Sequence, residues 1–251
     1  MPAEESTAAI VLRARDYSES DRIVTLLTLE FGKLSGIAKG AKASRRRFER
    51  KLEPFSHVNL FFRRRPQGQL VFITRAEPGD IRPPVIEDDL AKIALGSYML
   101  ELADALTSEE AEAADAYQVL VRALQTLGDG AVTLAMRQSL ELNLLRAAGF
   151  GLDFARCRIC AAAEAAAGSA VYFVVARGGI VCARCRPQAP EGAVRLTAAA
   201  TAALAALAAA PVEHAAILTH AGSDGALAIA RFLASILDRK LRSVEFLDSL
   251  L

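Results

Sequence analysis

The stretch RIVTLLTLEFGKLSGIA, residues 22–38, decides the fold class of this chain. Its first half, residues 22–29, is dense in the β-branched residues isoleucine, valine and threonine, with leucines between them, and that composition favours a β-strand. Phe31-Gly32-Lys33 then predicts a tight turn, because a glycine can take the positive φ that such turns often need. Residues 34–38 predict a short second strand, so the stretch indicates a β-hairpin.

Three more strands are expected around this hairpin. Residues 9–14 precede it, and residues 57–63 and 70–74 follow it, the last two joined by a turn at Pro66-Gln67-Gly68. Residues 41–52, between the hairpin and the strand at 57–63, are basic and poor in strand formers, and they predict a loop or a short helix. Five short strands with the long connection between the third and the fourth are typical of an OB-fold β-barrel. An SH3-like barrel also has five strands and stays open as an alternative.

The pattern changes from strands to helices after about residue 80. Pro78, Pro83 and Pro84 mark the boundary. Beyond it, apolar residues at helical spacing predict helices over residues 88–106, 111–127, 132–148, 197–209 and 225–242. We therefore predict an α+β multidomain protein. We expect residues 1–80 to form an OB-fold domain, a fold that binds oligonucleotides such as DNA, and residues 81–251 to form an α-helical domain with a four-cysteine zinc module inserted at about residues 155–190.

Four cysteines form two closely spaced pairs, Cys157-x-x-Cys160 and Cys182-x-x-Cys185, with 21 residues between the pairs. Two such pairs at this separation indicate a structural zinc site. Four thiolates close the tetrahedral shell and leave no position for a substrate. Residues 171–181, with glycines at 178 and 179, predict a hairpin that carries the second pair, as in a zinc ribbon. Free cysteines or a redox pair are the alternatives, but a thioredoxin-like site needs only one pair.

Charge is sorted along the chain although the formal net charge is only +1. Residues 33–65 hold eleven basic residues against two glutamates, and residues 77–115 hold eleven acidic residues against two basic ones. Such sorting favours a polyanionic partner for the basic stretch. A solvated surface is the alternative interpretation. The candidate DNA-binding residues are Lys33, Lys39, Lys42, Arg45, Arg46, Arg47, Arg50, Arg63, Arg64 and Arg65.

Aromatic residues lie among these cations, and exposed rings could stack on bases. The candidates are Phe48, Phe55, Phe61 and Phe62. Because neighbouring strand residues face opposite sides, only one of Phe61 and Phe62 is expected to be available.

Catalysis is not indicated by any motif. The glycine pairs lack the context of a phosphate-binding loop. The three histidines, His57, His214 and His220, have no partners in sequence and are expected to be structural, at the surface or at helix caps. No apolar run is long enough to span a membrane, and residues 1–7 do not resemble a secretory signal. We expect a non-enzyme in the cytoplasm.

Several runs resemble the RecO family of bacterial recombination and repair proteins. They are DYSESDRIVTLLT at residues 16–28, FGK at 31–33, AKGAK at 38–42 and LEPF at 52–55. Together with the cysteine quartet, the resemblance covers essentially the whole chain and points to the zinc-bearing type of the family.

The resemblance implies a recombination mediator associated with the nucleoid. Family members bind single- and double-stranded DNA, anneal complementary strands, associate with RecR, contact the C-terminal tail of single-stranded DNA-binding protein and help to load RecA. The DNA-contacting role maps onto Lys33, Lys39, Lys42 and Arg45 to Arg47. The alanine-rich last third leaves the site for the partner tail unassigned. A zinc-ribbon factor that binds RNA or polymerase is the alternative, and strand annealing on plain DNA distinguishes the two.

Overall fold

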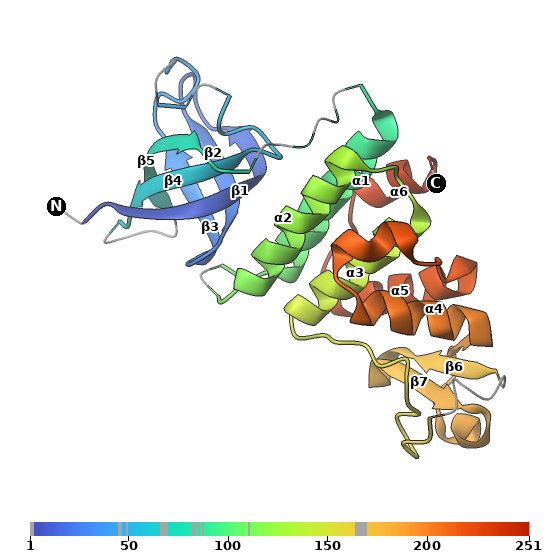
Figure 1. Cartoon of the computed structure of the whole chain (residues 1–251). Coiled ribbons are helices and arrows are strands. Elements are labelled where there is room, and N and C mark those ends of the chain that lie inside the picture. The colour runs from blue at the N-terminus through green and yellow to red at the C-terminus, as the bar shows by residue number, and fades with distance from the viewer. Residues whose placement is uncertain are drawn as a thin grey trace. The chain divides into compact units, whose positions relative to one another are not determined.

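The computed structural model describes residues 3–44, 47–48, 50–65, 70–81, 84, 86, 88–109, 111–163 and 170–250. The chain divides into two compact units, residues 1–129 and 130–251, which can be followed by colour in Figure 1. The change from strands to helices falls near residue 80, as predicted. Whether residues 1–80 form a domain of their own stays a prediction.

Five strands of the first unit close into a barrel. They are β1 (Glu5–Asp16), β2 (Arg22–Thr28), β3 (Gly32–Ala38), β4 (His57–Arg63) and β5 (Val71–Pro78). Their order around the barrel is β1-β2-β3-β5-β4, and β4 pairs with β1 to complete the closure. All neighbours are antiparallel except β3 and β5, which are parallel. The predicted OB-like barrel is confirmed, and the hairpin of residues 22–38 forms β2 and β3.

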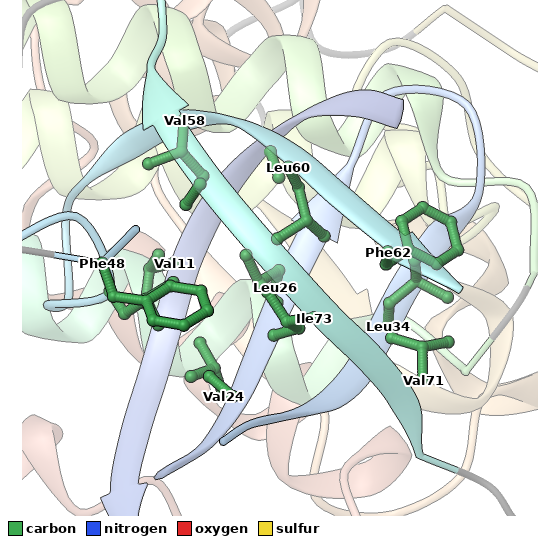
Figure 2. Close-up of a cluster of buried hydrophobic side chains, with 14 residues drawn as sticks. Val11, Val24, Leu26, Leu34, Phe48, Val58, Leu60, Phe62, Val71 and Ile73 are labelled. Carbon is green, nitrogen blue, oxygen red and sulfur yellow. The ribbon is translucent and has the colours of Figure 1, made fainter. Parts of the chain in front are cut away.

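Alternation along the strands fills the barrel with apolar side chains. Figure 2 shows the inward-facing cluster, which includes Val11, Val24, Leu26, Leu34, Phe48, Val58, Leu60, Phe62, Val71 and Ile73. Gly36 leaves room for this packing, because a Cβ on it would lie 2.7 Å from the Ile73 side chain. In the connection between β3 and β4, residues 47–48 and 50–55 form turns and bends rather than a helix, and they contribute Phe48 and Leu52 to the core.

Two helices complete the first unit, α1 (Leu90–Leu106) and α2 (Ala114–Asp129). The Asp89 side chain caps α1 by accepting a hydrogen bond from the Lys92 backbone N–H. Both helices pack against the barrel, α1 on β1 and α2 on β1 and β2. Gly32, with φ of 63°, brings the β2–β3 turn within contact of Ala111.

The second unit combines helices with a small sheet. The helices are α3 (Leu134–Ala147), α4 (Ala198–Ala209), α5 (Gly222–Ile236) and α6 (Ser243–Asp248), with 3-10 segments η2 (Val175–Arg177), η3 (Ala183–Gln188) and η4 (Val212–Ile217). The sheet has the order β7-β6-β8, formed by β6 (Val171–Val174), β7 (Gly179–Cys182) and β8 (Val194–Leu196). The predicted hairpin of residues 171–181 is therefore confirmed as β6 and β7.

Some predicted boundaries differ from the observed ones. The last predicted helix, residues 225–242, begins at Gly222 and ends at Ile236, because Leu237 takes an extended backbone conformation. Thr197 is the N-cap of α4, as predicted, and its hydroxyl accepts from the Ala200 N–H. The predicted turn at residues 66–68 lies outside the described residues. Within the described part of the chain, no helix is both long and apolar enough to cross a membrane.

Candidate nucleic-acid interface and metal centre

The four cysteines come together at one end of the small sheet. Cys157 and Cys160 lie in a turn before β6, while Cys182 ends β7 and Cys185 lies in η3. Their sulfur atoms all lie within 4.8 Å of one another, and the Cys160 and Cys182 sulfurs are 3.8 Å apart. A tetrahedral ion with metal–sulfur bonds near 2.3 Å needs sulfurs about 3.8 Å apart. The quartet therefore fits a four-coordinate metal ion.

Backbone hydrogen bonds hold the two cysteine turns in this geometry. The Arg158 N–H donates to the Ile180 carbonyl at 2.8 Å, which ties the first turn to β7. The Cys182 N–H donates to the Cys157 sulfur at 3.4 Å, and the Arg184 guanidinium donates to the Cys160 sulfur at 3.6 Å. Such donors stabilise thiolates, the form that binds a metal.

The pKa values of the thiols follow from burial and from these donors. Burial raises the pKa of Cys157, but N–H groups of Cys160, Cys182 and Ile159 outweigh it and lower that pKa to about 6. The Ala162 N–H and then Arg184 lower the pKa of Cys160. Burial raises the pKa of Cys182, and it raises the pKa of Cys185 to about 12. Four adjacent thiolates need a cation among them, and a divalent metal supplies that charge.

Several candidate DNA-binding cations cluster where the β1–β2 turn meets the chain after β3. The Lys42 ammonium donates to the Ser18 carbonyl at 2.9 Å and pairs with the Asp16 carboxylate at 2.8 Å. The Arg47 guanidinium donates to the Lys39 carbonyl at 3.1 Å. Lys39, Lys42 and Arg47 are exposed. We call this surface, made of Lys39, Lys42 and Arg47, the cation corner.

Other candidates of the basic stretch lie elsewhere. Arg50 is exposed with φ of 51°, while Arg45 and Arg46 lie outside the described residues. The Lys33 ammonium is largely buried, and it donates to the Asp104 carbonyl at 2.7 Å and to its carboxylate at 3.2 Å. Lys33 therefore already has a partner in α1 and is the candidate least available to a phosphate.

The second basic cluster, Arg63 to Arg65, is partly neutralised by the start of β1. Arg64 pairs with Glu5 at 3.3 Å, and Arg63 lies 4.0 Å from Glu4. Arg65 is exposed. The structure therefore does not join this cluster into one free cationic surface.

One of the four aromatic candidates is wrong, because Phe48 is buried in the barrel core at 3% exposure and cannot reach a base. Phe62, at 0% exposure, is the core member of the Phe61–Phe62 pair, as alternation predicted for one of the two. Phe61 faces outward, as alternation requires, but the Arg75 guanidinium lies over its ring at 3.5 Å. Phe55 is half-buried and packs against Gly96 of α1.

His57 has a structural role and His214 is exposed, as predicted. The buried His57 is bonded through Nε2 to the Tyr117 hydroxyl at 2.7 Å, and its Nδ1 accepts from the Ile81 N–H. Burial lowers the pKa of His57, so the neutral ring is favoured. His220 caps the start of α5 by accepting from the Gly222 N–H.

Sequence reasoning missed the residues of β1 and its turn that lie beside the cation corner. Arg15 and Tyr17 are exposed, and Tyr17 retains 64% of its accessible surface. The signal was present in the run RARDYSESDR, residues 13–22, where charged residues and an aromatic interrupt an otherwise apolar strand pair.

Comparison with known proteins gives the family. Residues 1–82 match the model described as Recombination protein O N terminal, and residues 87–245 match Recombination protein O C terminal. The chain belongs to the RecO family. Relatives named DNA repair protein RecO include one from Anaeromyxobacter sp. (strain Fw109-5), 39% identical over 246 residues that cover 95% of this chain and 93% of the relative. Another, from Symbiobacterium thermophilum, is 31% identical over 96% of this chain and 95% of its own length.

Membership of the RecO family supports a role in DNA repair and recombination. The two family models divide the chain near residue 85, between the barrel and α1. The barrel, with its cation corner, lies within the N-terminal match, and the cysteine quartet lies within the C-terminal match.

Proposed function

We propose that this protein is a non-catalytic recombination mediator that binds single- and double-stranded DNA and anneals complementary strands. The observation that carries the proposal is the exposed cation corner on an OB-like barrel, in a chain of the RecO family. OB-type barrels bind oligonucleotides on one face and in the loops at its edge. The proposed DNA-binding residues are Lys39, Lys42, Arg45, Arg46, Arg47, Arg50 and Arg65, with Arg63 and Arg64 at the margin.

The mechanism is electrostatic. Each lysine or arginine that meets a phosphate releases condensed counterions, which drives binding without reading the sequence. Annealing brings two negatively charged strands together, and their repulsion opposes it. A cationic surface that holds one strand lowers the local negative charge and thereby lowers this repulsion. Proton transfer and bond cleavage are not needed for any of these steps.

The quartet of Cys157, Cys160, Cys182 and Cys185 is proposed to hold one structural zinc ion. Four cysteine sulfurs within 4.8 Å of one another could fill all four positions of a tetrahedral shell, which favours zinc in a structural role. The ion would tie the turn at residues 157–160 to β7 and η3, adding to the hydrogen bond from the Arg158 N–H to the Ile180 carbonyl.

The family membership extends the proposal to partners. With RecR, the protein would help to load RecA onto single strands coated by single-stranded DNA-binding protein, after contacting the C-terminal tail of that protein. Such work places it in the cytoplasm, at the nucleoid. The residues of the second unit that would receive the tail are not assigned.

The experiment that tests the proposal is strand annealing on plain DNA. Two complementary oligonucleotides, one carrying a fluorophore and the other a quencher, are mixed with the protein in low salt. We expect annealing well above the spontaneous rate, with no requirement for a nucleotide cofactor, and a decline as salt rises. A rate equal to the spontaneous one, together with no mobility shift of a single strand at low salt, would exclude the proposal.

A control variant locates the activity. Lys39→Ala with Arg47→Ala removes two exposed cations of the corner, while Arg177→Ala with Lys240→Ala removes two exposed cations of the second unit. The first pair should slow annealing more than the second. RNA of the same sequence, tested in parallel, reports on the alternative of an RNA-binding factor.

A further inference from the structure

Tyr17 is the first residue of the β1–β2 turn and directly follows Asp16, the last residue of β1. It retains 64% of its accessible surface, more than any other large apolar side chain that the structure describes in the first unit. A single exposed aromatic ring is common in folded proteins and by itself indicates nothing. The setting of this ring is what distinguishes it.

The turn that carries Tyr17 is held firmly. The Tyr17 N–H donates to the Asp21 carbonyl at 3.1 Å, and the Asp21 N–H donates to the Ser18 hydroxyl at 3.1 Å. The Asp21 carboxylate accepts from the Gly40 N–H at 2.9 Å, which ties the turn to the chain after β3. A ring on an ordered backbone loses little conformational entropy when it binds a ligand, so its contact is used efficiently.

Cations lie close to Tyr17 along the chain and across the turn. The Lys42 ammonium contacts the two residues next to Tyr17, the Asp16 carboxylate at 2.8 Å and the Ser18 carbonyl at 2.9 Å. Arg15, two residues before Tyr17, is exposed.

The acidic residues of the turn are largely neutralised. Asp16 is paired with both Lys42 and Arg22, the latter at 3.2 Å. The Gly40 N–H, with a smaller contribution from Lys39, lowers the pKa of Asp21, so this carboxylate is satisfied within the protein. Glu19 is the exposed acid that opposes binding here. The surroundings of the ring therefore remain compatible with a phosphate backbone.

We propose that Tyr17 stacks on an unpaired base of a nucleic acid strand whose phosphates lie on the cation corner. The inference rests on the proposed function and deepens it, because it names the form of DNA that the barrel prefers. Phosphate contacts hold single strands and duplexes alike, but a ring can stack on a base only where the base is not already stacked in a duplex. Tyr17 thus gives the barrel its preference for single strands, and it does so without sequence specificity, since every base has a π-face.

Two substitutions separate the ring from the charges. Tyr17→Ala should weaken binding of a dT oligonucleotide about 5-fold or more at a given salt concentration, and it should leave binding of a duplex of equal length unchanged. Tyr17→Phe keeps the ring and should bind like the parent chain. Lys39→Ala, the matched variant for charge, should weaken both ligands. Equal affinities of Tyr17→Ala and the parent for dT, or equal weakening for dT and duplex, would overturn the inference.

A fluorescence measurement detects stacking directly. The chain contains no tryptophan, so Tyr17→Trp places a single indole in the protein. Stacking on a base should quench its emission when dT is added, and an abasic oligonucleotide of the same length should bind without this quenching. Phe246→Trp, at an exposed position of the second unit, is the matched control and should not respond. Binding of dT without quenching of Tyr17→Trp would contradict stacking.

The outcomes distinguish this inference from the proposed function. The parent chain can bind single strands with a clear salt dependence while Tyr17→Ala binds dT as tightly as the parent and Tyr17→Trp shows no quenching. In that case the base-stacking role fails and the DNA-binding function stands. If the parent chain does not bind single strands even at low salt, both fail.

Discussion

The buried pair of His57 and Tyr117 should link the stability of the first unit to pH and to one hydroxyl group. His57 begins β4 and Tyr117 lies in α2, so their hydrogen bond of 2.7 Å joins barrel and helix. The His57 Nδ1 accepts from the Ile81 N–H, so the proton resides on Nε2 and is donated to Tyr117. Tyr117→Phe removes the acceptor and leaves that N–H buried without a partner.

The size of the effect follows from burial. An unsatisfied buried donor costs about 1–3 kcal/mol, which corresponds to a fall of about 5- to 150-fold in an opening equilibrium. Hydrogen exchange of peptides covering β4 and α2 measures that equilibrium locally in the full chain. Tyr17→Phe, which removes the same hydroxyl from an exposed ring, is the matched control and should change protection little. Equal protection in Tyr117→Phe and the parent would refute the reasoning.

Acid should weaken the same contact. Burial lowers the pKa of His57 below its ordinary value of 6.5, with Asp80 opposing the shift. The unfolded chain therefore binds a proton on this residue at a higher pH than the folded chain does. The contribution of neutral His57 to the stability of the first unit is complete above about pH 6.5. It is lost as pH falls from there toward the lower pKa of the folded state. Within that interval the free energy of unfolding decreases by at most about 1.4 kcal/mol for each pH unit. His57→Gln should remove this step, and a parent chain with equal protection at pH 7.5 and 5.5, relative to intrinsic exchange rates, would contradict the assignment.

Three further predictions concern the metal, a buried ion pair and a helix cap. Metal analysis of the purified chain should find about one zinc per molecule. Cys182→Ser should lose the ion and destabilise the second unit, while the barrel retains its affinity for DNA. A chain that stays fully folded after chelation would argue against a structural ion. Lys33→Ala removes one ion-pair partner of the Asp104 carboxylate, which is 8% exposed and also lies 3.7 Å from Arg13. This change should destabilise the first unit by up to about 3 kcal/mol, whereas Arg65→Ala should stay within about 0.5 kcal/mol, and urea unfolding compares the two. Thr197→Ala should destabilise α4 by about 1 kcal/mol, because it removes the hydroxyl that accepts from the Ala200 N–H. The loss is measured as reduced hydrogen-exchange protection in the first turn of α4. Protection of Thr201, further along the helix, is the internal reference.

Much of the architecture could be predicted because it depends on local signals. The density of β-branched residues at 22–28 and the run of valine, leucine and phenylalanines at 57–63 yielded strands with ends within one residue of those observed. The spacing of the cysteines anticipated their convergence, since a metal site requires all four sulfurs at one point whatever the intervening chain does.

The remaining features depend on contacts between distant residues, which local patterns do not reveal. Lys33 looked like a surface cation because its partner Asp104 lies 71 residues further along the chain. The same contact joins the basic stretch to the acidic one and so partly offsets the sorting of charge seen in the sequence. Phe48 lies in a basic loop by sequence, yet the loop folds its ring into the barrel core. The exposure of the Tyr17 ring cannot be predicted from the sequence of its turn alone.

The salt dependence of single-strand binding tests the central claim most directly. Affinity for a mixed-sequence oligonucleotide is measured from low to moderate salt for the parent chain, for Lys39→Ala with Arg47→Ala, and for the control pair Arg177→Ala with Lys240→Ala. If the corner meets phosphates, the slope of log affinity against log salt should fall by about 0.7 for each lost contact, or about 1.4 for the corner variant, and the control should run parallel to the parent. A corner variant that runs parallel to the parent would show that these cations do not touch DNA, and the barrel would lose its assigned role.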